Sequence, residues 1–134
     1  MCWINNSIPD LLTAYVDIPI LKVGESKGEN VMISPYRGFE YELGKTYCLG
    51  QALRVRGTSW YCFVNEGFHS YNSLDVYIHN ESWAVLVYKN SHYIINQYPP
   101  TVSVFKGIVP EGAHYYINRY GEIVSDKIVI LNKL

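Results

Sequence analysis

The chain has 134 residues, of which 49% are hydrophobic and 17% are charged. One domain spanning residues 1–134 suits this length, and the apolar fraction excludes a disordered tail because its burial can offset the entropy of ordering. Eleven basic and twelve acidic residues give a net charge of -1, which excludes a protein that holds a nucleic-acid polymer through a broad basic face.

The first predicted elements are strands separated by glycine and proline. Residues 17–25 (DIPILKVGE) predict a strand that ends in the turn GESKGEN, and residues 30–34 (NVMIS) predict a second strand. The next stretch, SPYRGFEYELGKTY, contains a proline and two glycines that divide it into short extended pieces. Residues 52–57 (ALRVRG) and 60–64 (WYCFV) then indicate a hairpin that turns at 57–59.

The one predicted helix start follows this hairpin. Asn72 or Ser73 can cap the helix, and Asp75 lies in its first turn near the positive end of the dipole. Apolar residues at helical spacing share one face of this segment: Leu74, Tyr77 and Ile78. The apolar run 83–88 (WAVLVY) is compatible with a buried helix or with a buried strand.

The C-terminal third is rich in β-branched and aromatic residues. Three runs predict a meander of strands, with turns at PEG and at Gly121, over residues 101–109, 113–118 and 122–131. The whole pattern predicts an α+β fold, in which a mainly antiparallel β-sheet carries one or two helices in a single domain.

The three cysteines do not form a metal-binding pattern. Cys2, Cys48 and Cys62 include no CxxC pair and have no histidine at ligand spacing, so we expect neither a metal site nor a cofactor. The odd count, without a secretory-signal pattern at the N-terminus, favours a reduced, cytoplasmic protein. The longest nearly apolar run is far shorter than the ~20 residues that span a bilayer, so we expect no membrane segment.

Thirteen tyrosines against four phenylalanines are the unusual feature of the composition. Tyrosine combines a stacking face with a hydroxyl group, so it suits strand surfaces, pocket walls and subunit contacts. Together with the low charge fraction and sheet edges that are not obviously protected, this content predicts a homo-oligomer.

Arg37 is the first candidate ligand contact. It lies between Tyr36 and a glycine, where its planar guanidinium can stack on an aromatic ring while it binds a phosphate or a carboxylate. The alternative is a surface ion pair with Glu40 or Glu42. Phe39 is the second aromatic residue beside this arginine.

Arg54 and Arg56 are two residues apart on a predicted strand, so both project from the same face. Two like charges side by side are unfavourable unless an anion or an acidic neighbour separates them. A phosphate-bearing ligand, or an acidic patch of a second subunit, would satisfy both arginines.

The stretch EGFHSYNSLD places His69, Ser70 and Tyr71 at the entry to the predicted helix. Free backbone N–H groups at a helix N-terminus attract anions, and a histidine or hydroxyl beside them adds a donor to a phosphate. The alternative is local, with Ser70 and Asn72 as caps and His69 packed under the sheet. No catalytic Ser–His pair is inferred, because sequence neighbours seldom face each other and no third orienting group is identifiable.

Glu122 follows a turn glycine and begins a predicted strand, from which its carboxylate can reach a site at the sheet edge. The alternative, which we favour, is an exposed acid near Arg119 or Lys127. Phosphate-loop, dinucleotide-binding and zinc-hydrolase signatures are absent. No catalytic residue is assigned, and the candidate ligand-binding residues are Tyr36, Arg37, Phe39, Arg54, Arg56, His69, Ser70, Tyr71 and Glu122.

Four segments carry a resemblance to a known group of proteins. DIPILKV, SPYRGFEYELGKTY, EGFHSYNSLD and VFKGIVPEGAHYYINRYGEIVSDKIVI occur in this order and cover most of the chain. The chain resembles a family of small phage and bacterial proteins that begin with a short Met-Cys arm and end in a proline–glycine turn, a tyrosine pair and a valine–serine strand.

The resemblance implies two directions for function. Small phage proteins of this character resemble the viral sponges of the host cytoplasm, homo-oligomers that bind the cyclic nucleotide or ADP-ribose signals of defence systems such as Thoeris and CBASS. A similarity to the three-part signature of ADP-ribosyltransferases would put Lys22 first, Ser70 or Tyr71 second and Glu122 third. Lys22 departs from the arginine or histidine that this signature has at its first position.

Three hypotheses on function follow. The first is a phage-type anti-defence sponge that sequesters a small nucleotide signal, such as a cyclic nucleotide or cyclic ADP-ribose, without catalysis. The second is an ADP-ribosyltransferase-like or nucleotide-cleaving enzyme, which requires Glu122 and residues 69–71 to meet around one pocket. The third is a protein-binding inhibitor of a host effector that uses the tyrosine-rich surface.

Overall fold

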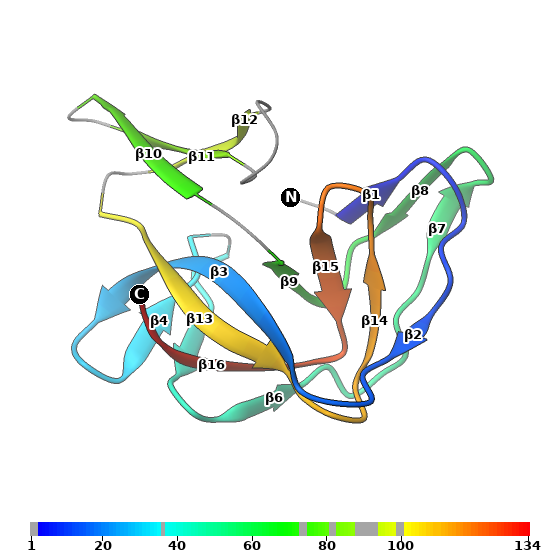
Figure 1. Ribbon diagram of the computed structural model, residues 1–134, viewed down its shortest axis with the longest axis horizontal. Helices are drawn as coiled ribbons and strands as arrows, with labels where there is room; N and C mark the ends of the chain where they lie inside the picture. Colours follow the sequence, from blue (N-terminus) through cyan, green and yellow to red (C-terminus); the bar gives the residue numbers. More distant parts are fainter. Residues whose placement is uncertain (1–2, 36, 73–74, 81–82, 88–93, 99–100) are drawn as a thin grey trace.

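The computed structural model consists of three antiparallel sheets (Figure 1). The described residues are 3–35, 37–72, 75–80, 83–87, 94–98 and 101–134. All regular elements in these residues are strands, and none is a helix. The expectation of an α+β fold is therefore wrong, since the described chain is all-β.

The largest sheet has ten strands and passes through the order β2-β14-β15-β9-β3-β13-β16-β6, with β4 paired to β3 and β5 paired to β4. Its strands are β2 (Leu12–Thr13), β3 (Ile18–Lys27), β4 (Val31–Ile33), β5 (Glu40–Glu42), β6 (Thr46–Cys48), β9 (Phe68–Tyr71), β13 (Ser103–Val109), β14 (His114–Ile117), β15 (Glu122–Ser125) and β16 (Lys127–Lys133). Neighbours in this sheet are mostly distant in sequence, so long-range pairing defines the fold.

Two three-stranded sheets accompany it. One has the order β1-β8-β7 and lies beside β14 and β15 at the right of Figure 1; the other has the order β10-β11-β12 and lies at the upper left. Their strands are β1 (Trp3–Asn5), β7 (Arg56–Thr58), β8 (Tyr61–Val64), β10 (Asp75–Asn80), β11 (Trp83–Val87) and β12 (Ile94–Tyr98).

The segment expected to be a helix is strand β10, which pairs with β11 through Asp75↔Val87 and the following residues. Its β-branched and aromatic residues suit a strand, and the neighbouring strand supplies the backbone partners that a helix would find locally. Asn72 does not cap a helix, because its backbone N–H donates to the Gly121 carbonyl at 2.9 Å. The apolar run at 83–88, whose sequence is compatible with a helix or a strand, contains strand β11. The cap candidate Ser73 and the apolar Leu74 lie outside the described residues.

Other strand predictions are confirmed with changes in extent. The first two strands exist as β3 and β4, and the hairpin exists as β7 and β8, although its first strand begins only at Arg56. The C-terminal meander is wrong in part. β14 and β15 form a hairpin, whereas β13 pairs with β3 and β16, and β15 pairs with β9.

The main hydrophobic core draws on strands from nearly the whole large sheet. Ile123 comes from β15 and Ile130 from β16, which are separated by three other strands in the sheet order. Because these residues belong to one buried cluster, the sheet must curl around it, and Figure 1 shows β3, β13 and β16 bending across the left and lower left of the view, with the upright β14 and β15 to their right. The other buried members are Ala14, Ile20, Met32, Tyr41, Phe105, Val109, Ala113 and Ile128.

A second cluster fills the opposite side of β14 and β15. It consists of Trp3, Val64, Tyr116 and Val124, all buried. All four residues of β15 are buried, and its alternate side chains face opposite sides, with Ile123 in the main core and Val124 in the second cluster. The indole Nε1–H of Trp3 donates to the Glu122 carbonyl at 2.8 Å, which fixes the start of β15 against β1.

We predict that Trp3→Phe destabilises the protein by roughly 1–3 kcal/mol, because it removes the buried hydrogen bond to the Glu122 carbonyl. Trp60→Phe is the matched control, since Trp60 is 73% exposed and Trp3 is 0% exposed. Urea unfolding monitored by circular dichroism measures both changes. Equal midpoints for the two variants would contradict this role of Trp3.

Candidate functional site

A cavity of about 290 Å³ opens between β3, β9 and the connection from β4 to β5. β3 and β9 pair through Leu21↔Tyr71 alone. Residues next to that pair on both strands line the cavity, including Lys22 and His69. The cavity therefore lies where two central strands of the large sheet stop pairing.

Lys22 is the central cation of the cavity. Its side chain is buried, and its Nζ donates to the His69 carbonyl at 2.5 Å, which ties β3 to β9 next to their single pair. The Nζ also lies 5.6 Å from the ring centroid of Tyr41, within the range of a cation–π contact. Burial lowers the pKa of Lys22 from 10.5 to about 8.

His69 lies on strand β9 rather than at a helix N-terminus, and it lines the cavity. Burial, and next the positive charge of Lys22, lower the pKa of His69 to about 4. The imidazole is therefore neutral at pH 7. The anion site expected from a helix dipole is wrong, because the residues before and after this position form strands.

Tyr71 and Glu122 face each other across β9 and β15. They are direct partners in the antiparallel register, so their side chains share one face, and both line the cavity. The expectation that Glu122 is an exposed acid near Arg119 or Lys127 is wrong, since Glu122 is 6% exposed. The alternative, a carboxylate that reaches a site, agrees with its place in the cavity wall.

Asn118 holds Glu122 in place. Its side-chain Nδ2 donates to Glu122 Oε1 at 3.2 Å, and its Oδ1 accepts from the Glu122 backbone N–H at 3.0 Å. The same Nδ2 donates to the Ile4 carbonyl at 2.9 Å. This asparagine therefore links the carboxylate, the β14–β15 turn and strand β1, and it gives the buried acid the hydrogen bonds that burial requires.

Arg37 lines the cavity from the β4–β5 connection. Its φ of 66° is the one positive value for a non-glycine residue in the described chain, a conformation that is unfavourable by about 1–3 kcal/mol. The acids proposed as its surface partners form ion pairs with lysines: Glu40 with Lys27 at 2.6 Å, and Glu42 with Lys45 at 3.8 Å. Its charge is also one of the causes that keep the pKa of His69 low.

Aromatic rings form one wall of the cavity. Phe39 and Tyr41 lie 4.7 Å apart by ring centroid, and Tyr41 lies 6.3 Å from Phe68. Phe39 is about half exposed, whereas Tyr41 is buried. Burial, and next the neighbouring Tyr47, raise the pKa of Tyr41, so its phenol stays protonated. The wall thus offers stacking surfaces without adding charge.

The remaining predicted site residues lie elsewhere. Ser70 points to the other face of β9, where it is 0% exposed and its hydroxyl has no hydrogen-bond partner among the described residues. Arg54 and Arg56 are exposed and do not line the cavity, and Arg54 precedes strand β7. Tyr36 lies outside the described residues.

Sequence reasoning missed Tyr41, Phe68 and Asn118 as site residues, and it introduced Lys22 only through the resemblance to ADP-ribosyltransferases. One signal was available for Lys22, because a lysine within the otherwise apolar PILKV interrupts a strand that must be buried. The role of Asn118 depends on the turn that follows β14, and no local pattern marks it.

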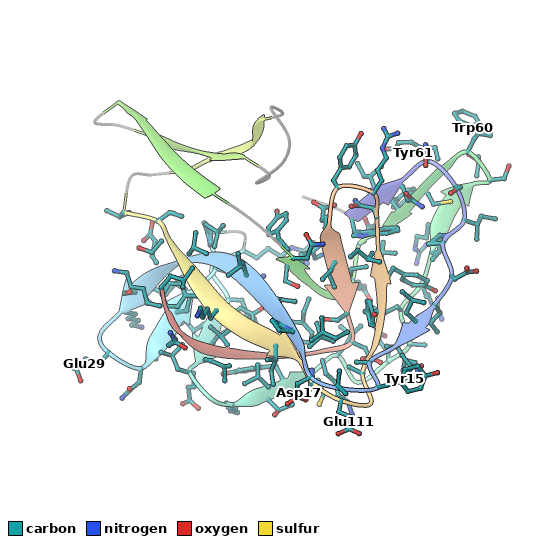
Figure 2. The ribbon with its side chains drawn as sticks, in the orientation of Figure 1. Tyr15, Asp17, Glu29, Trp60, Tyr61 and Glu111 are labelled. Atoms are coloured by element: carbon teal, nitrogen blue, oxygen red, sulfur yellow. The ribbon has the colours of Figure 1, made fainter. Side chains whose placement is uncertain are left out.

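Exposed aromatic residues form a separate feature at the tip of the β7–β8 hairpin. Trp60 is 73% and Tyr61 47% exposed, and Figure 2 shows both at the outer end of that hairpin. The protein-binding hypothesis uses the tyrosine-rich surface, to which Tyr61 belongs and beside which Trp60 lies, and that hypothesis and the homo-oligomer both remain predictions. A pull-down from host lysate in which Trp60→Ala recovers the same proteins as the wild type would contradict this use.

No protein-family model, curated protein or solved structure matches the chain. None of the described residues belongs to a helix that is long and apolar enough to cross a membrane. Within the same residues, no group of three or more His, Cys, Asp or Glu side chains could hold a metal ion.

We predict that removing the Lys22 amine reveals its pH-dependent contribution to stability. Since burial lowers its pKa from 10.5 to about 8, the unfolded chain binds more protons between these values, and stability rises with pH across this window. Below pH 8 the charged lysine destabilises the fold by roughly 3 kcal/mol, and this effect disappears as pH approaches 10.5.

Urea unfolding of wild type and Lys22→Met at pH 7, 8.5 and 10 measures this contribution. The relevant quantity is the difference in unfolding free energy between the two proteins at each pH. The buried tyrosines have raised pKa values that reduce stability above pH 10, and this contribution is the same in both proteins, so it cancels in the difference. The unfolding free energy of the wild type, relative to that of the variant, should increase as pH rises. A constant difference would contradict the lowered pKa of Lys22.

Proposed function

We propose that the protein is a phage-type anti-defence sponge, which binds a small nucleotide signal in the cavity and sequesters it without catalysis. The proposed ligands are cyclic nucleotides and cyclic ADP-ribose. One observation carries the proposal: the buried ammonium of Lys22 and the guanidinium of Arg37 line the same cavity as the aromatic rings of Phe39 and Tyr41. Phosphate and base are the two parts of a nucleotide that such groups recognise.

The energetics of Lys22 support an anionic ligand. A buried cation is unfavourable, and an anion that enters the cavity would add a countercharge to that of Glu122. Arg37 adds a planar group that can bind two phosphate oxygens at once. Glu122 then limits the choice of ligand, because its carboxylate favours a hydrogen-bond donor, such as a base amide or a ribose hydroxyl, at the opposite side of the cavity.

The size and walls of the cavity favour one compact ligand. Its volume of about 290 Å³ is near the lower end of the roughly 300–1,000 Å³ that small-molecule pockets span. A ligand the size of a mononucleotide suits this volume better than a polymer. Sequestration requires affinity alone, and a neutral His69 still has one N–H with which it can bind a phosphate beside the two cations.

We predict that one member of a nucleotide panel raises the melting temperature of the wild type. The panel contains cyclic mononucleotides, cyclic dinucleotides, cyclic ADP-ribose and linear mononucleotides. Because binding stabilises the folded state by mass action, a saturating ligand at a hundred times its Kd adds about 2.7 kcal/mol. Heat-denatured samples should release the ligand unchanged by chromatography, and a panel without any shift would end the proposal.

Lys22→Met and Lys106→Met provide the matched pair of variants for this titration. Lys22 contributes a charge-assisted hydrogen bond to the ligand, so its loss should weaken binding by about ten- to a hundredfold in calorimetry. Lys106 is an exposed lysine on β13, and its replacement should leave the affinity unchanged. Equal losses in both variants would indicate non-specific attraction between charges.

A second candidate, an ADP-ribosyltransferase-like or nucleotide-cleaving enzyme, is favoured by the geometry of three residues. Lys22, Tyr71 and Glu122 line one cavity, as this function requires. A buried carboxylate opposite a tyrosine can orient a ribose and stabilise positive charge that develops when a glycosidic bond breaks. Lys22 in place of an arginine or histidine is the departure that weakens this candidate.

We predict for this candidate that Glu122→Gln lowers the rate of NAD or cyclic-nucleotide cleavage at least about a hundredfold, as expected for a general acid–base or charge-stabilising group. Glu29→Gln is the control, because Glu29 is exposed in the β3–β4 turn, at whose outer end Figure 2 shows it, and does not line the cavity. Liquid chromatography after long incubation measures product. Unchanged substrate peaks at high wild-type concentration would exclude the enzyme.

A further inference from the structure

Lys22 differs from the other lysines of the described chain. It is 8% exposed, whereas Lys127 is partly exposed and Lys27, Lys45, Lys106 and Lys133 are exposed on the surface. Its amine borders a cavity, so a small molecule can reach it although bulk solvent is largely excluded. A desolvated amine beside an accessible cavity is the setting in which lysine acts as a nucleophile.

The groups around Lys22 favour its neutral form. Arg37 brings a second positive charge to the cavity, and the neutral imidazole of His69 supplies no countercharge. The neighbouring Tyr41 phenol stays protonated because burial raises its pKa. Glu122, in the same cavity, is the one buried acid that favours the ammonium, and it already accepts a hydrogen bond from Asn118. Glu66, an exposed acid that accepts a hydrogen bond from Gln51, lines the outer part.

The bond from Lys22 to the His69 carbonyl orients the amine. Nζ donates to this oxygen at 2.5 Å, and a neutral amine that donates one N–H keeps its lone pair for another partner. The backbone acceptor therefore holds the nitrogen at the cavity wall without consuming its nucleophilic electrons. An exposed lysine has no such preorganisation, because its side chain samples many rotamers.

We propose that the Lys22 amine forms a Schiff base with small aldehydes or ketones that carry a phosphate or a carboxylate. This reactivity does not depend on the proposed nucleotide binding. Arg37 would hold the anionic group of the carbonyl compound, and the aromatic wall would cover its apolar part.

The chemistry needs no oxidant and no reductant. The Nζ lone pair attacks the carbonyl carbon, one amine proton passes to the carbonyl oxygen, and a carbinolamine forms. The nitrogen then loses its one remaining proton, the hydroxyl takes up a proton and leaves as water, and a C=N bond replaces the C=O bond. Glu122 and Tyr71 line the same cavity and can transfer protons in the dehydration step.

Reductive trapping with pyridoxal 5′-phosphate tests this inference on the full chain at pH 8. Borohydride converts an imine into a stable secondary amine, and peptide mass spectrometry locates it. Because burial lowers the pKa of Lys22 to about 8, about half of its amine is neutral at pH 8, and we expect Lys22 to be labelled at least about tenfold faster than Lys106 or Lys133. Pyridoxal without the phosphate should label it more slowly.

Lys22→Arg and Lys106→Arg are the matched variants, because each keeps a positive charge but cannot form an imine. Lys22→Arg should lose the fast label and retain the slow surface labelling, while Lys106→Arg should keep the fast label. Melting curves confirm that both variants are folded. Labelling of Lys22 at the rate of the surface lysines overturns the inference, whether or not any nucleotide binds; protection by a bound nucleotide would support one shared cavity.

Discussion

The double burial of β15 is the constraint on which the site depends. Its side chains enter the main core on one side and the Trp3 cluster on the other, so the strand cannot shift its register without exposing one of them. Its first residue is Glu122, whose backbone bonds to Trp3 and Asn118. A carboxylate therefore starts a fully buried strand at a fixed place. Pairing with β9 then sets Tyr71 and His69 on the same cavity wall.

The cavity also lies where unfavourable features reduce the stability of the fold. β3 and β9 form a single residue pair, so the backbone groups beside that pair are not bonded to each other as they would be in a longer ladder. The Lys22 ammonium donates to one of them, the His69 carbonyl. A methionine or leucine at this position would pack without a buried charge. Retention of a lysine here, next to Arg37 in a strained conformation, concentrates two unfavourable features in one cavity, as is common at functional sites.

Local sequence patterns predicted most strands but not the site. β3 and β4 follow from β-branched runs bounded by turns, and these patterns act over a few neighbouring residues. The predicted helix failed because Asn72 and Asp75 are equally suited to the ends of strands, and the Gly121 carbonyl engages Asn72 from far along the chain. Burial of Glu122 likewise follows from pairing between distant strands, which no single segment encodes. Five of the predicted ligand-binding residues line the cavity, namely Arg37, Phe39, His69, Tyr71 and Glu122, and His69 and Tyr71 do so from a strand rather than from a helix N-terminus.

The side chain of Arg37 and the backbone conformation at this position have opposite effects on the protein. A glycine would adopt its φ of 66° without strain, so replacement of this arginine by glycine would relieve backbone energy while it removes a cation from the cavity wall. The side chain and the backbone at position 37 therefore have opposite effects: the guanidinium adds a cation to the cavity wall, and the backbone conformation that carries it is one that glycine adopts more readily.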